Sequence, residues 1–453
     1  MAKLQKQTKT PMSLAVINHH TAAIDVGSML MMVSYSDAQG NQCLTQADGF
    51  TQGIQQLAKT LKQASVTDVA MEATGVYWMA LYEVLEDHGL SVTLVNPRHF
   101  KNVHAQKTDV LDCQWLHQLH AHGLLKASHI APELYRELKN YLHERNILQQ
   151  QKSDTLNRIH RLLTLMNIKV QHLISDIEGV AAMKLLHSIA NGVKDPAILL
   201  SQIDVHRLKA GKEELLLSLQ GTYKDQFIII LQRLLKAYDF YKQEMKAYEL
   251  FIEEVLKKML PEDEHGNKPE VNKKKGLVRK NQYSINLKEY LKNILGTDTT
   301  QIDGMEEITV LEVVSVTGAD MSKWPTSDHF VSWLNLSPRP KKSGGKILGH
   351  QKRFNHNRAT QAFRLAAQTM WRNNGSLGRL YKRLAAQKGA KKAIKAVARK
   401  LAVIFYQMVK NKTQYDKTRL VTEQKYHERK IAGLKKIAAL YGFVLQPKIV
   451  TSL

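Results

Sequence analysis

The chain has 453 residues, of which 43% are hydrophobic and 23% are charged, and its formal net charge is +24. This composition is typical of about two to four folded domains and excludes extensive disorder. No stretch resembles a membrane span or a secretion signal, and two cysteines are too few for a disulfide framework or a thiolate zinc site. We therefore expect a cytoplasmic protein with no membrane partner.

The positive charge is concentrated toward the C-terminus. The segment from Val331 to Leu453 carries 28 Lys and Arg but only 3 Asp and Glu, whereas the first 330 residues carry 37 basic and 38 acidic residues. No acidic residue lies between His329 and Tyr415. Unpaired positive charge on one segment predicts a polyanion partner, and nucleic acid is the leading candidate.

The first 130 residues are the only region in which we predict a sheet. The predicted strands cover 21–36, 42–47, 66–73 and 91–97, and the predicted helices cover 53–64, 76–89 and about 108–122. A strand hairpin followed by alternating helices and strands indicates a mixed α/β sheet.

The middle of the chain is predicted to be helical from Pro132 to about Leu260. Two runs without Pro or Gly, 136–166 and 225–260, are longer than ordinary globular helices. They predict antiparallel or coiled-coil arms, which commonly mediate self-association or span a ligand. Polar residues at 261–283 predict an exposed insertion. We therefore expect domains at 1–130, 131–294 and 295–453.

The last domain is predicted to consist of basic helices. A turn at Asp303–Gly304 indicates two short helices that could present backbone N–H groups to a phosphate, although an ordinary helical hairpin fits as well. Longer helices are expected at 357–373, 376–387 and 391–411, with Ala and Leu facing inward. Since we find no acidic residue nearby, we expect sequence-independent phosphate contacts from one face of the last helix, formed by Lys391, Lys392, Lys395, Arg399 and Lys400.

Four carboxylates have placements that suggest a metal site. Asp25 and Glu72 lie in or at the end of apolar strands, where a buried carboxylate without a partner costs several kcal/mol. Asp109 and Asp112 are three residues apart at the start of a helix, so they share one face. Four carboxylates at one sheet edge repel each other unless divalent cations separate them. Two magnesium ions held in this way suit phosphodiester cleavage.

Each carboxylate taken alone has another interpretation. Asp109 fits a helix cap or a first-turn acid, Asp25 could belong to an actin-like or sugar-kinase phosphate loop, and Glu72 could be a satisfied buried acid. Taken together, one carboxylate on each of two strands followed by two on a helix favour a ribonuclease-H-like nuclease core.

Ser343 lies in the segment WLNLSPRPKKSGGKILGH at 333–350, beside two glycines and close to Lys341, Lys342 and Lys346. Glycines let a phosphate approach the backbone, and lysines would neutralise its charge. A serine in such a pocket could attack a phosphodiester and hold the strand covalently. Composition alone favours a flexible loop on a DNA-binding surface. Further nucleic-acid contacts are expected from Lys352, Arg353 and Arg358.

Two sets of motifs resemble a family of transposases. AIDVGS, MEATGVYW, the strand ending in VNP and KTDVLDCQWLHQL occur in the order and spacing of the DEDD, RuvC-like domain of the insertion-sequence-one-ten (IS110) family, and its eleven-eleven branch is the more similar. PRPKKSGGK, NRATQAFRLAAQTM, YKRLAAQKGAKKAIKAVARKLA and YGFVLQP resemble the family's C-terminal domain. The two domains cover most of the chain, whereas the middle helices match only in character.

The resemblance assigns roles to individual residues. It implies that Asp25, Glu72, Asp109 and Asp112 form the DEDD set with magnesium, preceded by the basic residue Lys107. It also implies that Ser343 is the nucleophile, which reverses the preference for a simple loop. The family usually has Ala after the last Asp, where this chain has Cys113, and both residues are small.

The resemblance also implies an architecture and an activity. The expected fold is a RuvC-like mixed-sheet domain, a long helical middle and a basic helical C-terminal domain. The expected activity is recombination of double-stranded donor and target DNA through a serine–DNA link. A structured bridge RNA would pair with both DNAs. The protein would act as a homodimer or homotetramer in which the carboxylates of one subunit meet the serine of another.

Three other classes of protein remain possible on the residues alone. A Holliday-junction resolvase would use the carboxylates for hydrolysis and form no covalent adduct. An actin-like ATPase would need a second Gly-rich phosphate loop, which we do not find, and it gives the basic C-terminal third no role. A non-catalytic nucleic-acid-binding protein leaves the four costly carboxylates unexplained.

Overall fold

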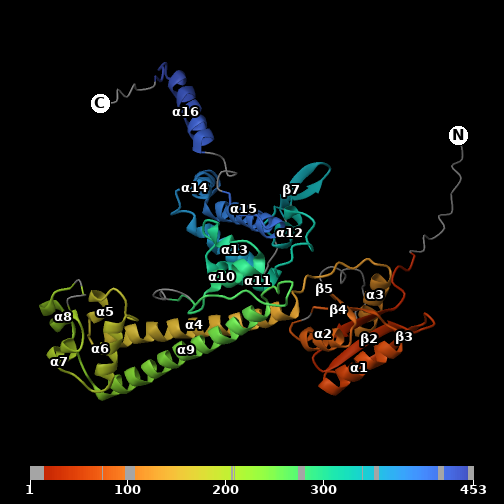
Figure 1. The fold of residues 1–453 in the computed structure, drawn as a ribbon, viewed down its shortest axis with the longest axis horizontal. Helices are drawn as coiled ribbons and strands as arrows, with labels where there is room; N and C mark the ends of the chain where they lie inside the picture. The colour runs from red at the N-terminus through yellow and green to blue at the C-terminus, as the bar shows by residue number, and fades with distance from the viewer. Residues whose placement is uncertain are drawn as a thin grey trace. The chain divides into compact units, whose positions relative to one another are not determined.

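In the computed structural model, the chain forms two compact units, Met1–Ile130 and Ala131–Leu453 (Figure 1). The structure describes residues 15–73, 75–96, 108–205, 208, 210–273, 281–338, 340–350, 357–416 and 423–446. Within these ranges, no helix is both long enough and apolar enough to cross a lipid bilayer.

The N-terminal unit is a five-stranded mixed sheet with helices on both faces. Its strands are β1 (Thr21–Val26), β2 (Leu30–Ser36), β3 (Gln42–Asp48), β4 (Asp68–Glu72) and β5 (Ser91–Val95), in the order β3-β2-β1-β4-β5. The pairs β1–β4 and β4–β5 are parallel, and β1–β2 and β2–β3 are antiparallel. Helices α1 (Thr51–Gln63) and α2 (Trp78–Asp87) pack on one face, and α3 (Asp109–Ala121) packs on the other. The predicted mixed α/β sheet is confirmed.

The segment 21–36, which we predicted as one continuous strand, forms the two antiparallel strands β1 and β2. The chain reverses direction at residues 27–29, where a Cβ atom on Gly27 would lie 2.3 Å from the carbonyl oxygen of Leu30. Only glycine fits such a close approach without a shift of the backbone. The prediction failed because Ser28 is the only polar residue between Val26 and Met31, so the apolar pattern shows no break.

The second unit is built around two long helices, α4 (Glu133–Leu165) and α9 (Asp225–Lys258), which lie side by side (Figure 1). They are antiparallel, because the start of α4 packs with the end of α9 in one apolar cluster and the other two ends meet in a second cluster. The second cluster is completed by α5 (Val170–Leu173), α6 (Val180–Ala190), α7 (Pro196–Ser201) and α8 (Lys212–Ser218). The two predicted long helices are confirmed.

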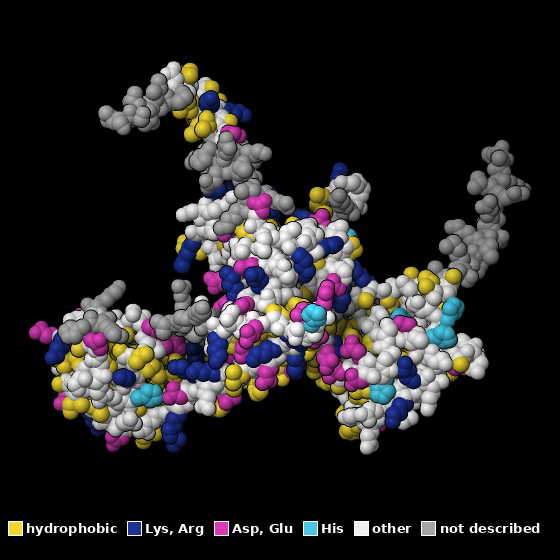
Figure 2. Space-filling view, viewed as in Figure 1, with side chains coloured by type: hydrophobic (Ala, Val, Ile, Leu, Met, Phe, Trp, Pro, Cys, Tyr) yellow, Lys and Arg dark blue, Asp and Glu magenta, His cyan; other side chains and the backbone are white. Residues whose placement is uncertain are grey.

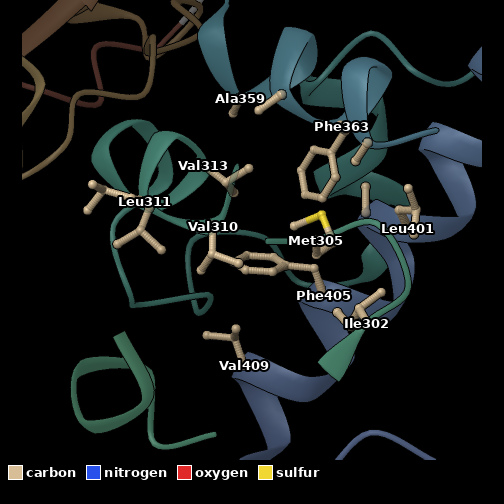
Figure 3. Packing of buried hydrophobic residues seen from close by; sticks show 14 of the residues in the cluster. Ile302, Met305, Val310, Leu311, Val313, Ala359, Phe363, Leu401, Phe405 and Val409 are labelled. Carbon is tan, nitrogen blue, oxygen red and sulfur yellow. The ribbon is translucent and has the colours of Figure 1, made fainter. Parts of the chain in front are cut away.

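The larger apolar cluster joins α4 and α9 to the C-terminal helices. These are α10 (Leu287–Leu295), the short 3-10 helix η3 (Thr299–Gln301), α11 (Glu307–Thr317), α12 (Ser327–Trp333), α13 (Arg358–Thr369), α14 (Ser376–Lys388) and α15 (Ala390–Asn411). Phe363 of α13 and Phe405 of α15 meet near Met305 at its centre (Figure 3). The predicted domain boundary at residue 294 lies at the end of α10. It remains a prediction, because the helices on both sides of it belong to the same apolar cluster.

The last helix is α16 (Glu423–Leu440), whose hydrophobic side chains lie at the surface (Figure 2). Around the turn at Asp303–Gly304, the predicted pair of helices consists of the single turn η3 and the regular helix α11. A single 3-10 turn is too short to act as the first helix of a phosphate-binding hairpin.

The predicted exposed insertion at 261–283 is correct at its start and wrong at its end. Residues 261–270 are exposed, but Tyr283 is only 1% exposed. The ring of Tyr283 lies 3.8 Å from the guanidinium carbon of Arg145. The segment therefore returns to the core at a residue that its polar neighbours conceal in the sequence.

A buried ionic network fixes α4 against α9. The Arg145 guanidinium of α4 donates hydrogen bonds to Glu249 Oε1 of α9 at 2.6 and 3.1 Å. Glu249 Oε2 accepts from both the backbone N–H and the hydroxyl of Ser284. Arg145 and Glu249 are 3% and 4% exposed, so removing either one leaves the other as a buried charge with an incomplete set of partners.

We expect Arg145→Leu to lower the free energy of unfolding of the second unit by about 3–5 kcal/mol, because Glu249 would lose its countercharge in a low-dielectric site. Urea denaturation followed by circular dichroism measures the change. Arg158→Leu is the matched control, since Arg158 lies on the exposed face of the same helix. Equal midpoints for the two variants would contradict the prediction.

Candidate functional sites

Asp25 and Glu72 point toward the face of the sheet that α3 covers. Side chains alternate between the two faces along a strand. Ala23 and Ala70 belong to the small apolar cluster that includes Leu116 of α3, so the residues two positions later share that face. Ile24 of β1 pairs with Met71 of β4, which makes Asp25 and Glu72 neighbours in the parallel register.

The first turn of α3 carries Asp109 and Asp112 and is anchored next to β1. Thr108 caps this turn by accepting a hydrogen bond from the backbone N–H of Leu111. The Cys113 thiol lies 3.3 Å from the Ala23 carbonyl oxygen and 3.2 Å from that of Met32, which pairs with Asp25. Burial raises the pKa of Cys113 to about 12, and the nearby Asp25 carboxylate acts in the same direction.

The four predicted carboxylates therefore lie on two neighbouring strands and on the helix turn packed beside them. Glu72 is buried, Asp112 is half-buried and Asp109 is exposed. Their carboxylate oxygens are the donors that Mg²⁺ prefers, so the chemistry of the set fits a divalent cation. In the described ranges, however, no three His, Cys, Asp or Glu side chains converge closely enough to hold a metal ion. Lys107 lies outside the described residues.

Two histidines of α3, His117 and His120, are buried. His117 Nε2 lies 3.0 Å from the Thr21 carbonyl oxygen, and Nδ1 lies 2.9 Å from the Ser34 hydroxyl, as suits a neutral ring that donates from Nε2. Burial lowers the pKa of His117 to about 4 and also lowers that of His120. His117 thus attaches α3 to β1 and β2. Two hydroxyl residues on apolar strands, Thr21 and Ser34, were the only sequence sign of this contact.

Ser343 ends one strand of a hairpin that we had predicted as a loop. The strands β6 (Pro340–Ser343) and β7 (Lys346–His350) pair through a two-residue turn at Gly344–Gly345. The φ angles of the turn are +54° and +77°, values that glycine adopts without strain. The short, lysine-rich strands concealed the hairpin, and the Gly-Gly pair was its only signal.

The hairpin exposes the proposed nucleophile and its basic neighbours. The side chains of Lys341, Ser343 and Lys346 are exposed, and Ser343 lies directly opposite Lys346 in the register. Lys342 belongs to β6, but the structure does not describe its side chain. Lys352 and Arg353 lie outside the described residues.

The basic face of α15 is exposed at Lys391, Lys392, Lys395 and Lys400. Arg399 on the same face is half-buried, and its Nη2 lies 2.9 Å from Asp328 Oδ1. The expectation that no acidic residue is near this face is therefore wrong. The sequence did not indicate this ion pair, because Asp328 lies just before the acid-free segment and more than 60 residues before α15, and only the fold brings the two together.

Arg358, another predicted nucleic-acid contact, is already engaged within its own unit. Its Nη1 lies 4.0 Å from Glu312 Oε2, and its Nη2 contacts the ring of His143. These contacts connect the start of α13 to α11 and α4.

Two family models match separate parts of the chain. Residues 22–168 match a family model for DEDD transposases of the IS110 type, described as "Transposase". Residues 299–382 match the model described as "Transposase IS116/IS110/IS902 family". The first match contains the four carboxylates, the second contains Ser343, and together they span about half of the chain. No curated protein matches this sequence.

We expect the N-terminal unit to lose stability as the pH falls from 6.5 toward 4. In this window the unfolded chain binds a proton at His117 that the folded unit does not, so the free energy of unfolding decreases by about 3 kcal/mol. Urea midpoints at several pH values measure the slope. His117→Gln should reduce the slope, leaving the part that the second buried histidine, His120, contributes, whereas Gln118→Ala, a change at an exposed position of the same helix, should leave it unchanged. The same slope in all three proteins would count against this assignment.

Proposed function

The chain belongs to the IS110 family of transposases, and from this premise we propose that it cuts and rejoins DNA through a covalent link between Ser343 and the strand. The carboxylates would act with magnesium, and a structured bridge RNA would select the DNA. The observation that carries the proposal is the presence of two chemistries in one chain. One is a set of carboxylates on adjoining elements, and the other is an exposed serine in an acid-free basic segment.

The proposed chemical step transfers a phosphodiester to Ser343 and back. The hydroxyl oxygen loses its proton and bonds to phosphorus, while one phosphorus–deoxyribose oxygen bond breaks and the departing oxygen takes up a proton. Attack by a hydroxyl of another strand reverses these changes and frees the serine. The bond is exchanged rather than hydrolysed, so rejoining needs no energy source. Exposure of Ser343 at the end of β6 supports access to a DNA strand.

Asp25, Glu72, Asp109 and Asp112 are the residues that would hold the divalent cations, two if the whole set takes part. Bound magnesium would stabilise the negative charge that develops on the phosphate. Asp109 and Asp112 lie in the first turn of α3 and retain side-chain freedom, so they can adjust toward a cation beside Asp25 and Glu72. Cys113 and His117 would keep the helix in place during this adjustment.

The basic C-terminal segment supports a nucleic-acid role with little direct reading of sequence. Lysines such as Lys391 and Lys400 contact phosphates, which are the same at every position of a strand. Choice of donor and target DNA would then fall to pairing with the RNA. The long helices α4 and α9 would serve assembly of the dimer or tetramer.

We expect a covalent protein–DNA band when the protein, its co-purifying RNA, magnesium and a labelled DNA carrying the element junction are combined and then denatured. Ser343→Ala should abolish the band because no hydroxyl remains to bond to phosphorus. Asp25→Asn should reduce it by at least about a hundredfold through loss of charge at the cation site. Denaturing gel electrophoresis measures it, and ribonuclease treatment beforehand should remove it as well.

Two exposed or half-exposed residues provide controls: Ser337→Ala, close to the hairpin in sequence, and Asp87→Asn, at the end of α2. Both variants should retain the band. If DNA is cut without an adduct, and Ser343→Ala cuts equally well, the serine mechanism is wrong and the chain acts as a metal-dependent nuclease of the resolvase kind.

We further expect mixing of Ser343→Ala with Asp25→Asn protein to restore part of the adduct that neither forms alone. A mixed oligomer contains one pairing of intact carboxylates from one subunit with an intact serine from the other. The adduct should run with the Asp25→Asn chain, which a size tag on one variant reveals on the same gel. No restoration in mixtures that demonstrably exchange subunits would show that each subunit uses its own serine.

A further inference from the structure

A groove with a volume of about 590 Å³ lies between α14, α15 and the loop before β6. Its apolar lining residues, which we call its floor, are Leu336, Pro338, Leu380, Leu384, Ala396 and Val403. Its remaining lining residues, Lys392, Lys395, Arg399 and Lys400, are basic. Apolar floor and cationic rim together suit a ligand that has a flat or apolar body and negative charge at its edge.

Most of the positive charge around the groove has no ion pair among the residues that the structure describes. Asp328 pairs with Arg399, while three lysines of the rim remain exposed to solvent. At the start of α15, Gly389 provides no side-chain cap, and the first turn contains Lys391 and Lys392 but no acidic residue. Cations at a helix N-terminus oppose the helix dipole, and the free N–H groups there attract anions. A phosphate at this end would satisfy both features.

We propose that this groove binds one unstacked nucleotide of a single-stranded DNA segment. This inference rests on the proposed function insofar as DNA is the substrate. The base and the deoxyribose would lie against the apolar floor near Leu384 and Val403, and the flanking phosphates would contact Lys392 and Lys395. Stacking or packing of a base on a protein surface tolerates any sequence, since every base has a flat face.

The lining chemistry determines which nucleotides fit. Among the groove's lining residues, the only side chains that can form hydrogen bonds are those of the three lysines and Arg399, which are donors drawn first to the charged phosphates, so the apolar lining offers a base little besides contact with its flat face. No lining side chain can accept a hydrogen bond from a ribose 2′-hydroxyl, and burial of that hydroxyl against apolar groups is unfavourable. The groove therefore favours deoxyribonucleotides of any sequence.

The place of the groove in the chain connects it to the proposed cleavage step. Pro338 precedes Ser343 by five residues, which span at most about 18 Å even when fully extended. A nucleotide in the groove would thus lie within a few nucleotides of the scissile phosphate. Holding it out of the stack would keep the strand single and positioned at the serine.

The test measures binding of labelled oligomers to the full-length protein by fluorescence anisotropy, in buffer with a chelator so that no cleavage occurs. Three probes of equal length are compared: oligodeoxyuridylate, an abasic deoxyribose-phosphate oligomer and oligouridylate. The wild-type protein should bind oligodeoxyuridylate about tenfold more tightly than the abasic oligomer, which carries the same charge without bases. It should also bind oligouridylate more weakly than oligodeoxyuridylate.

Leu384→Asn should remove most of the preference for the oligomer with bases while leaving affinity for the abasic oligomer unchanged. Val403→Thr, which keeps the branched shape of the side chain and adds one hydroxyl at a half-buried position, should reduce the same preference, and circular dichroism checks that the variant is folded. Leu365→Asn is the matched control, because Leu365 is 53% exposed on α13 and does not line the groove. Lys395→Gln should weaken binding of both deoxyribose oligomers equally and reduce the salt dependence by about one ion.

The proposal fails if Leu384→Asn and Val403→Thr keep the wild-type preference for bases, or if oligouridylate binds as tightly as oligodeoxyuridylate. These outcomes are independent of the covalent chemistry, since no metal is present and Ser343 takes no part. A missing protein–DNA adduct would leave the groove intact, and a groove without base preference would leave the serine mechanism intact.

Discussion

Side-chain alternation along β1 and β4 is the constraint on which the N-terminal unit depends. Ile24 and Met71 belong to the core under α1 and α2, while Ala23 and Ala70 lie under α3. Small residues at these two positions let α3 approach the sheet closely enough for Cys113 to reach two backbone carbonyl groups. A slip of one residue would turn Asp25 into the apolar core and remove this anchor. The register that stabilises the sheet is therefore the same register that presents the carboxylates.

The C-terminal helices carry an excess of positive charge. Self-repulsion of so many lysines and arginines opposes a compact state. Packing offsets it: Phe330 lies in aromatic contact with both Phe363 and Phe405, and alanines let the helices pack closely. The described ion pairs of the acid-free segment use carboxylates from outside it, Asp328 and Glu312. Under the proposed function, phosphates of a bound nucleic acid would add the remaining countercharge, so nucleic-acid binding would raise the stability of this region.

Much of this organisation could be predicted from sequence because its signals are local. Long runs without Pro or Gly specify α4 and α9, and a carboxylate in the apolar run AIDVGS marks Asp25. Most failures involve contacts between residues far apart in the sequence, and the reversal at Gly27 is a local exception. The reversal at Gly27 depends on one close backbone approach, and the burial of Tyr283 depends on Arg145, more than a hundred residues earlier. The groove is lined by residues from three separate segments of the chain, so no local sequence pattern indicates it.

The distribution of acids along the chain has a chemical consequence for Ser343. A serine hydroxyl is a weak nucleophile until a base or a metal assists its deprotonation. Its exposed neighbours on the hairpin are Lys341 and Lys346, and no Asp or Glu occurs between His329 and Tyr415 to serve as that base from nearby in the sequence. The carboxylates that would assist it under the proposed function belong to the other compact unit. In the proposed mechanism, the basic segment can therefore bind any DNA through its phosphates without cutting it. Cleavage waits until a carboxylate site joins the serine on a selected strand, which restricts the chemistry to assembled complexes.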